Sequence, residues 1–166
     1  SCKMKIIKRL SIKYNFKIIE DASHALGAKY FDKPVGNCNY SDITVFSFHP
    51  IKSITTAEGG VALTNDKNLA NKMKIFSEHG IVRHHKNFKG KIDGPWIYQQ
   101  QELGYNYRLS DVHAALGISQ LKRLSKFLIK RNQISKLYEK KLKKLPIKFQ
   151  EKQAHTFSSK HLFIIL

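Results

Sequence analysis

The chain has 166 residues, 42% of them hydrophobic, which is enough for one domain with a buried core. Its net charge of +18 comes mainly from 25 lysines, against only five arginines. Because the lysines are dispersed and no nucleic-acid-binding module can be read, we favour a lysine-rich bias on solvated faces over a nucleic-acid-binding surface.

Short apolar strands alternate with helices along the first half of the chain. Apolar residues at helical spacing predict a helix over residues 3–14, and a short buried strand follows over residues 16–20. Turn residues predict an irregular excursion over residues 28–40, and two further strands are expected over residues 43–48 and 60–64.

Helices and a long loop are expected in the second half. The pair Asn65 and Asp66 supplies the N-cap of a helix that runs to about residue 78, and residues 80–103 form a loop long enough to be functional or disordered. The pair Ser110 and Asp111 caps a second long helix, which continues toward Leu145 and stops at Pro146. The last residues, 162–166, form an apolar strand, which we expect to lack a partner strand.

Metal and membrane sites are not expected. Cys2 and Cys38 form neither a disulfide framework nor a metal-spaced set, and the eight histidines are scattered. The chain contains no signal peptide and no apolar stretch of about 18 residues. We therefore expect a cytoplasmic protein without a metal.

Lys52 is the first candidate catalytic residue. It follows an apolar strand, lies among hydroxyl side chains and precedes the pair Gly59 and Gly60, which permits close backbone approach or a positive φ. A lysine delivered at a strand end, held still and partly desolvated, suits the formation of a Schiff base. One lysine among 25 carries little weight alone, so this interpretation depends on its neighbours in the fold.

Asp21 ends the apolar strand over residues 16–20, and this puts its carboxylate at the mouth of the sheet, where ligands bind. A pyridoxal phosphate enzyme needs such an acid opposite the pyridine nitrogen, although a capping or turn aspartate is the commoner role. Ala22 is small enough to lie flat against a ring. His24 could reach the ring hydroxyl, or it could be an ordinary hydrogen-bonding histidine.

Two further residues could bind a phosphate group. Ser47 ends a predicted strand five positions before Lys52 and could donate its hydroxyl, although a serine at a strand end is commonly a turn former. Asn106 lies between two tyrosines, ahead of a capped helix, and could donate its amide. Its alternative role is to shape the loop.

Jointly these stretches resemble the DegT/DnrJ/StrS sugar aminotransferases, which are fold-type I pyridoxal phosphate enzymes. The matches follow the order of the family over nearly the whole chain: IIEDASHA (18–25), FSFHPIK (46–52), TTAEGG (55–60), GYNYRLSD (104–111) and AALG (114–117). A closer likeness is to the branch that aminates a UDP-linked 4-keto-6-deoxy-N-acetylhexosamine for pseudaminic acid synthesis, through SCKM (1–4), VGNC (35–38), SDITVF (41–46) and DGPW (93–96).

The resemblance implies a role for each candidate residue. Lys52 would form the Schiff base with pyridoxal 5′-phosphate, and Asp21 would pair with its pyridinium nitrogen. Ala22 would lie against the ring, His24 would sit near the ring oxygen, and Ser47 would bind the phosphate. In a homodimer with shared sites, Asn106 would reach the partner's cofactor phosphate.

The resemblance also implies the reaction. L-glutamate would leave its amine on the cofactor, and C4 of the UDP-keto sugar would then take it up. Three alternatives stay open: an aminotransferase for another nucleotide-linked keto sugar, an inactive truncated remnant, and a basic module that binds nucleic acid.

The expected fold class is α/β. Family members carry an upstream segment and a larger C-terminal domain, so we expect this chain to be a fragment. Residues 1–145 would form a partial cofactor-binding large domain with the connecting long helix, and residues 146–166 would begin the small C-terminal domain.

Overall fold

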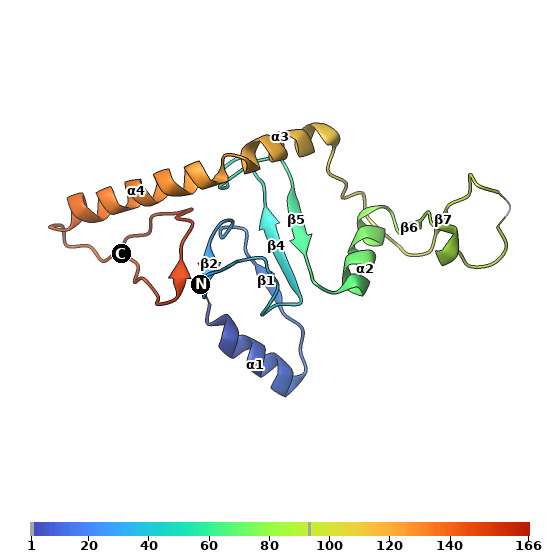
Figure 1. The fold of residues 1–166 in the computed structure, drawn as a ribbon, viewed down its shortest axis with the longest axis horizontal. Helices are drawn as coiled ribbons and strands as arrows, with labels where there is room; N and C mark the ends of the chain where they lie inside the picture. The colour runs from blue at the N-terminus through green and yellow to red at the C-terminus, as the bar shows by residue number, and fades with distance from the viewer. Residues whose placement is uncertain (1, 93) are drawn as a thin grey trace. The chain divides into compact units, whose positions relative to one another are not determined.

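A computed structural model describes residues 2–92 and 94–166 (Figure 1). Ser1 and Asp93, which belong to two of the stretches that resemble the pseudaminic acid branch, lie outside the described residues. The chain forms two compact units, one made of Ser1–Asn65 with Asp111–Leu166 and the other of Asp66–Ser110. Helices and strands are mixed in both, which agrees with the α/β prediction. The boundary expected at residue 146 stays a prediction.

The first unit is built around a three-stranded sheet in the order β1-β4-β5. The strands are β1 (Ile19–Asp21), β4 (Ile43–Ser47) and β5 (Gly60–Leu63). β1 runs parallel to β4, and β5 runs antiparallel to it. Because the carboxyl ends of parallel strands meet at one edge, the last residues of β1 and β4 lie at the same edge of the sheet.

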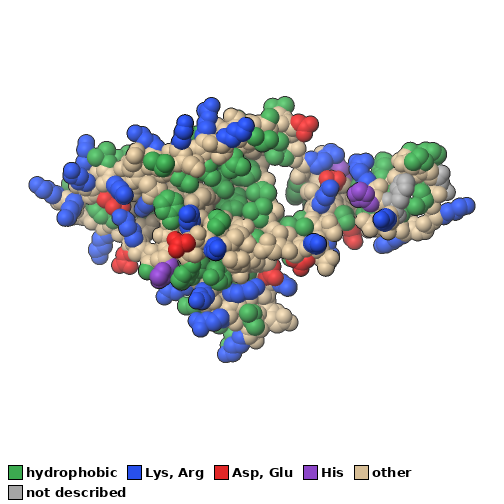
Figure 2. Space-filling model, viewed as in Figure 1, with side chains coloured by type: hydrophobic (Ala, Val, Ile, Leu, Met, Phe, Trp, Pro, Cys, Tyr) green, Lys and Arg blue, Asp and Glu red, His purple; other side chains and the backbone are tan. Residues whose placement is uncertain are grey.

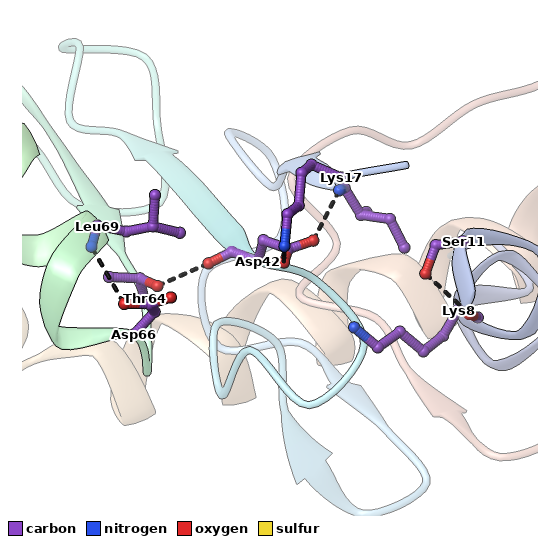
Figure 3. A network of polar contacts seen from close by, with 8 residues as sticks. Lys8, Ser11, Lys17, Asp42, Thr64, Asp66 and Leu69 are labelled. Atoms are coloured by element: carbon purple, nitrogen blue, oxygen red, sulfur yellow. Dashed lines mark hydrogen bonds and ion pairs between the residues drawn. The ribbon is translucent and has the colours of Figure 1, made fainter. Parts of the chain in front are cut away.

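β1 starts three residues later than the sequence predicts, and Asp42 explains the difference. The Ile18 amide donates to the Asp42 carboxylate at 2.9 Å instead of joining the strand ladder, and Lys17 Nζ donates to the same carboxylate at 3.3 Å (Figure 3). The Asp42 carbonyl accepts from Thr64 Oγ1 at 2.7 Å. The Ile18 amide, followed by Lys17, lowers the pKa of Asp42. One aspartate therefore ties together the ends of all three strands.

A second polar cluster lies between β1 and β4. Thr44 is fully buried, and its hydroxyl donates to Glu20 Oε2 at 3.1 Å and shares a 2.8 Å hydrogen bond with the buried Ser41. Glu20 and Thr44 are register partners in the sheet. Since a one-residue slip would leave these buried groups unpaired, the cluster favours the observed register.

The predicted first helix is confirmed as α1 (Met4–Tyr14), which ends at Asn15 in the left-handed conformation. The irregular excursion predicted over residues 28–40 is instead a short hairpin of β2 (Lys29–Tyr30) and β3 (Lys33–Pro34). β8 (Thr156–Phe157), from the far end of the chain, adds to β2 as a third strand.

The single long helix predicted from Asp111 is two helices, α3 (Asp111–Leu121) and α4 (Leu124–Leu142), which follow one another in nearly the same direction (Figure 1). At the junction the Arg123 amide donates to Gln120 O, three residues back, at 2.9 Å. This tighter turn interrupts the α-helical hydrogen-bond pattern. No Pro or Gly lies at the junction, so the sequence does not predict the break.

The apolar C-terminus is not the free strand that the sequence predicts. Lys148 and Leu166 exchange backbone hydrogen bonds of 2.7 and 3.0 Å, and Phe149 forms a bridge with Ile165. The Phe163 ring lies 5.1 Å from that of Tyr138 on α4. The segment therefore folds back on residues 148–149, and its Phe163 ring packs on α4.

The second unit holds α2 (Lys67–Ser77), whose N-terminus is capped by Asp66 as predicted: its carboxylate accepts from the Asn68 amide at 2.7 Å. The long loop predicted over residues 80–103 instead contains the strand pair β6 (Ile81–Val82) and β7 (Gln99–Gln100) and the 3₁₀ turn η1 (His85–Asn87). Gln99 extends the pairing with its side chain, which exchanges hydrogen bonds of 2.8 and 2.9 Å with the Lys89 backbone. The Gln99 side-chain amide thus joins the two sides of a segment that the sequence predicts to be a loop.

Lys and Arg side chains are spread over the face shown in Figure 2, which fits the compositional interpretation of the charge. Within residues 2–92 and 94–166, no helix is long and apolar enough to cross a membrane. The same residues contain no group of three His, Cys, Asp or Glu side chains that could hold a metal ion.

Candidate active site

Lys52 lies in the loop between β4 and β5, and hydrogen bonds to Phe48 close this loop. The Phe48 amide donates to Gly59 O at 2.8 Å, and its carbonyl accepts from the Thr56 amide at 2.9 Å and from Thr55 Oγ1 at 3.0 Å. The Lys52 amide donates to His49 O at 2.9 Å. Lys52 itself is half-buried. These hydrogen bonds within the loop therefore hold the backbone of Lys52 in place.

The glycine pair has the two properties expected from the sequence. Gly59 adopts φ +148°, a conformation that favours glycine. A Cβ on Gly60 would lie 2.6 Å from the carbonyl oxygen of Phe46, so only glycine lets β5 approach β4 this closely. On the other side of the loop, a Cβ on Gly117 of α3 would lie 2.8 Å from Thr56 Cγ2. The helix therefore packs closely against the Lys52 loop.

Asp21 ends β1 beside β4, opposite Val45 in the register. Its carboxylate accepts from Ser23 Oγ at 2.6 Å and from the Ser23 amide at 3.0 Å. These hydrogen bonds lower the pKa of Asp21, and the positive charges of His24 and Lys52 add to the effect. The carboxyl group is thus held ionised and lies within the electrostatic reach of Lys52.

Ala22 and His24 follow on the same turn. Ala22 is buried, and its amide donates to Val45 O at 2.9 Å, which continues the β1–β4 pairing past Asp21. His24 is exposed, and its imidazole lies 4.3 Å from that of His161, centroid to centroid. Burial lowers the pKa of His161, and the charges of His24, Lys52 and Arg131 lower it further.

Ser47 is the last residue of β4, paired with Gly60 across the ladder, and its hydroxyl accepts from the His49 amide at 3.4 Å. It therefore lies at the same sheet edge as Asp21. Asn106 belongs to the second unit, where it is exposed and its Oδ1 accepts from Arg108 Nε at 3.0 Å. The role expected for it in a partner's site stays a prediction.

Two cavities of the first unit are lined by residues of these segments. One, of about 530 Å³, is lined by Asp21 and Ala22 among other residues. The other, of about 500 Å³, is lined by Ser53, Arg131 and His161 among other residues. The first unit therefore offers open volume beside both Asp21 and the Lys52 loop.

His161 and its neighbour Ser159 are the residues that the sequence did not indicate. Ser159 Oγ donates to the backbone carbonyl of His24 at 3.0 Å, across 135 positions of sequence. A contact between residues 135 positions apart depends on the fold and leaves no local pattern in the sequence. Only the His24 end of this contact could be predicted.

The residues at this edge fit pyridoxal phosphate. A carboxylate whose pKa is lowered remains ionised at neutral pH and can keep a pyridine nitrogen protonated. A strand-end hydroxyl suits a phosphate oxygen, and a half-buried lysine can supply the amine. Asp21, Ser47 and Lys52 thus bring together the groups that the cofactor needs.

The model of the DegT/DnrJ/EryC1/StrS aminotransferase family matches residues 1–166. The chain belongs to this family. The UDP-4-amino-4,6-dideoxy-N-acetyl-beta-L-altrosamine transaminase of Campylobacter jejuni subsp. jejuni serotype O:23/36 (strain 81-176) is 45% identical over 172 residues, which cover 100% of this chain and 42% of that protein. The Helicobacter pylori (strain ATCC 700392 / 26695) transaminase of the same name is 38% identical over 88% of this chain and 36% of its own length.

Solved structures of the family have the same fold. Helicobacter pylori PseC, an aminotransferase involved in the biosynthesis of pseudoaminic acid, matches with a TM-score of 0.87 at 36% identity, over 100% of this chain and 42% of PseC. The sugar aminotransferase Spr1654 from Streptococcus pneumoniae in its PLP form matches with a TM-score of 0.84 at 28% identity, over 99% of this chain and 44% of Spr1654. These matches confirm the predicted family and fold class. The chain spans about 42% of the length of its C. jejuni relative.

Proposed function

We propose that the protein is a pyridoxal phosphate-dependent aminotransferase that moves an amino group from L-glutamate to C4 of a UDP-linked 4-keto-6-deoxy-N-acetylhexosamine. The observation that carries the proposal is the common edge of β1 and β4, where an ionised Asp21 lies within electrostatic reach of Lys52. The sugar follows from the relatives that are 45% identical and named for the aminated altrosamine product.

Pyridoxal phosphate, when bound, supplies an aldehyde that accepts the amino group and a ring that takes up the electrons of a broken C–H bond. Asp21 holds a proton on the ring nitrogen by charge pairing. Ser47 would bind a phosphate oxygen, Ala22 would lie against the ring, and His24 would sit near the ring oxygen. Lys52 supplies the amine that holds the cofactor, and it then serves as the base that takes the proton from Cα of L-glutamate.

In the second half of the reaction, Lys52 would deliver a proton to C4 of the keto sugar, the carbon that receives the amine. The lysine can serve both halves because its loop holds it in one place through the Phe48 hydrogen bonds. We also propose a homodimer in which Asn106 of each protomer donates to the cofactor phosphate held by the other. A cytoplasmic location is proposed because both substrates belong to that compartment.

The proposed function is tested by incubating the protein with pyridoxal phosphate, L-glutamate and the UDP-4-keto sugar, and by measuring 2-oxoglutarate and the amino sugar together. Equal amounts of the two products, both lost in Lys52→Ala, are expected. Another relative, the GDP-perosamine synthase of Escherichia coli O157:H7, is 35% identical over 144 residues, so a GDP-4-keto sugar is the competing substrate to compare. Preference for the GDP sugar would overturn the UDP assignment, and the absence of both products would overturn the aminotransferase activity.

A further inference from the structure

A short segment near the end of the chain holds His24 at two points. Ser159 is buried, and its hydroxyl donates to the His24 carbonyl at 3.0 Å. Two residues on, the His161 imidazole lies 4.3 Å from the His24 imidazole, with the rings tilted by 39°. One contact fixes the backbone of His24 and the other restricts its side chain.

The segment is itself anchored to α4. Arg131 Nη1 donates to the carbonyl oxygens of Lys160 and His161 at 3.3 and 3.2 Å, and Asn132 Nδ2 donates to Ser158 O at 3.4 Å. Just before it, β8 pairs with β2. The hydrogen bonds to α4 and the pairing of β8 with β2 hold this segment on both sides. Residues 158–161 can therefore act as a rigid support and not as a mobile tail.

His161 is suited to pack against another imidazole without becoming charged. The groups that face it are His24, Lys52 and Arg131, all of them cations or able to become cations. Its Nδ1 is buried and has no hydrogen-bond partner among the described residues. Its burial, together with the charges of Lys52 and Arg131, opposes protonation, so it remains a neutral ring against which His24 can lie.

We propose that Ser159 and His161 are positioning residues that fix the orientation of the His24 imidazole beyond the carboxyl end of β1. The proposal rests on the proposed function, in which His24 sits near the ring oxygen of the cofactor. An exposed histidine would otherwise sample several rotamers, and ordering it would weaken the binding of a ligand that needs one of them. Since an aromatic pair contributes roughly 0.5–1.5 kcal/mol, its loss corresponds to about a 2- to 10-fold change in affinity.

The first experiment needs no cofactor. Histidine ring C–H resonances are recorded by NMR for the protein without pyridoxal phosphate and for the variants His161→Ala, His161→Phe and Ser159→Ala. The ring current of His161 should shift the His24 resonances, so His161→Ala should move them and His161→Phe, which keeps an aromatic ring, should largely restore them. Ser159→Ala should broaden or shift them.

His155→Ala is the matched control, because His155 lies in the same C-terminal stretch and also stacks on an aromatic ring, that of Phe31 at 4.6 Å. It should leave the His24 resonances unchanged. The proposal is wrong if His161→Ala also leaves them unchanged, or if His155→Ala moves them as much.

The second experiment titrates pyridoxal phosphate into the same set and follows its absorbance. The affinity should fall about 2- to 10-fold in His161→Ala, recover in His161→Phe and stay the same in His155→Ala. Equal affinity in His161→Ala and the unmodified protein would overturn the positioning role. A failure of the unmodified protein to bind the cofactor would instead contradict the proposed function, and the NMR result would still decide whether His24 is held.

Discussion

Replacing Thr44 with valine tests whether the buried cluster between β1 and β4 stabilises the sheet that carries the site. Valine keeps the shape of threonine but removes the hydroxyl, which donates to Glu20 at 3.1 Å and pairs with Ser41 at 2.8 Å. Thr44 is fully buried and Ser41 is 5% exposed, so water cannot replace the lost partner. Leaving a buried polar group unpaired costs about 1–3 kcal/mol, and we expect a loss of about 2 kcal/mol in the free energy of unfolding.

The assay is urea unfolding followed by circular dichroism. With a slope of about 2 kcal/mol per M, a loss of that size lowers the midpoint by about 1 M without changing the slope. The melting temperature should fall by roughly 4–8 °C, on the scale of 2–4 °C per kcal/mol for a chain of this size.

Thr44→Ser is the matched control, because it keeps the hydroxyl and removes one methyl group, at a cost of about 1 kcal/mol. The valine variant should therefore be the less stable of the two. If valine is tolerated as well as serine or better, the polar cluster does not stabilise the sheet and our account of the β1–β4 register is wrong.

Three further predictions concern Asp21, Asn106 and pH. Asp21→Asn should still bind pyridoxal phosphate but lower kcat at least about 100-fold, because the amide cannot hold the ring proton by charge; near-normal kcat in steady-state assays would make Asp21 purely structural. Asn106→Ala mixed with Lys52→Ala should regain about a quarter of the unmodified activity through heterodimers with one intact site, whereas no recovery on mixing would refute the shared site. Asp21, Asp42 and Glu139 all have lowered pKa values in the folded protein. The stability that these three carboxylates contribute is therefore complete above about pH 5 and is lost as the pH falls through their folded pKa values. The urea midpoint should drop on acidification. A midpoint independent of pH between about 5 and 3 would contradict these shifts.

The elements that the sequence predicts best are those whose signal is local. The periodicity of α1 and the Asp66 cap of α2 both depend on a few neighbouring residues. Asp21 and Ser47 could be expected at one sheet edge because the carboxyl ends of neighbouring parallel strands meet there.

The wrong predictions depend on contacts between distant residues. The Asp42 side chain takes the Ile18 amide out of the strand, and Gln99 pairs through its side chain in a stretch that reads as loop. The C-terminal residues pair with residue 148 instead of ending as a free strand. The support that Ser159 and His161 give to His24 is of the same kind, because it joins residues 135 positions apart.

The central claim is that Lys52 carries the cofactor, and covalent trapping tests it most directly. The protein is loaded with pyridoxal phosphate, reduced with borohydride and digested, and the labelled peptide is sequenced by mass spectrometry. The account predicts one major label, on Lys52, that is absent when Lys52→Ala is treated in the same way. A label on another of the 25 lysines with none on Lys52, or equal labelling of the Lys52→Ala variant, would contradict it.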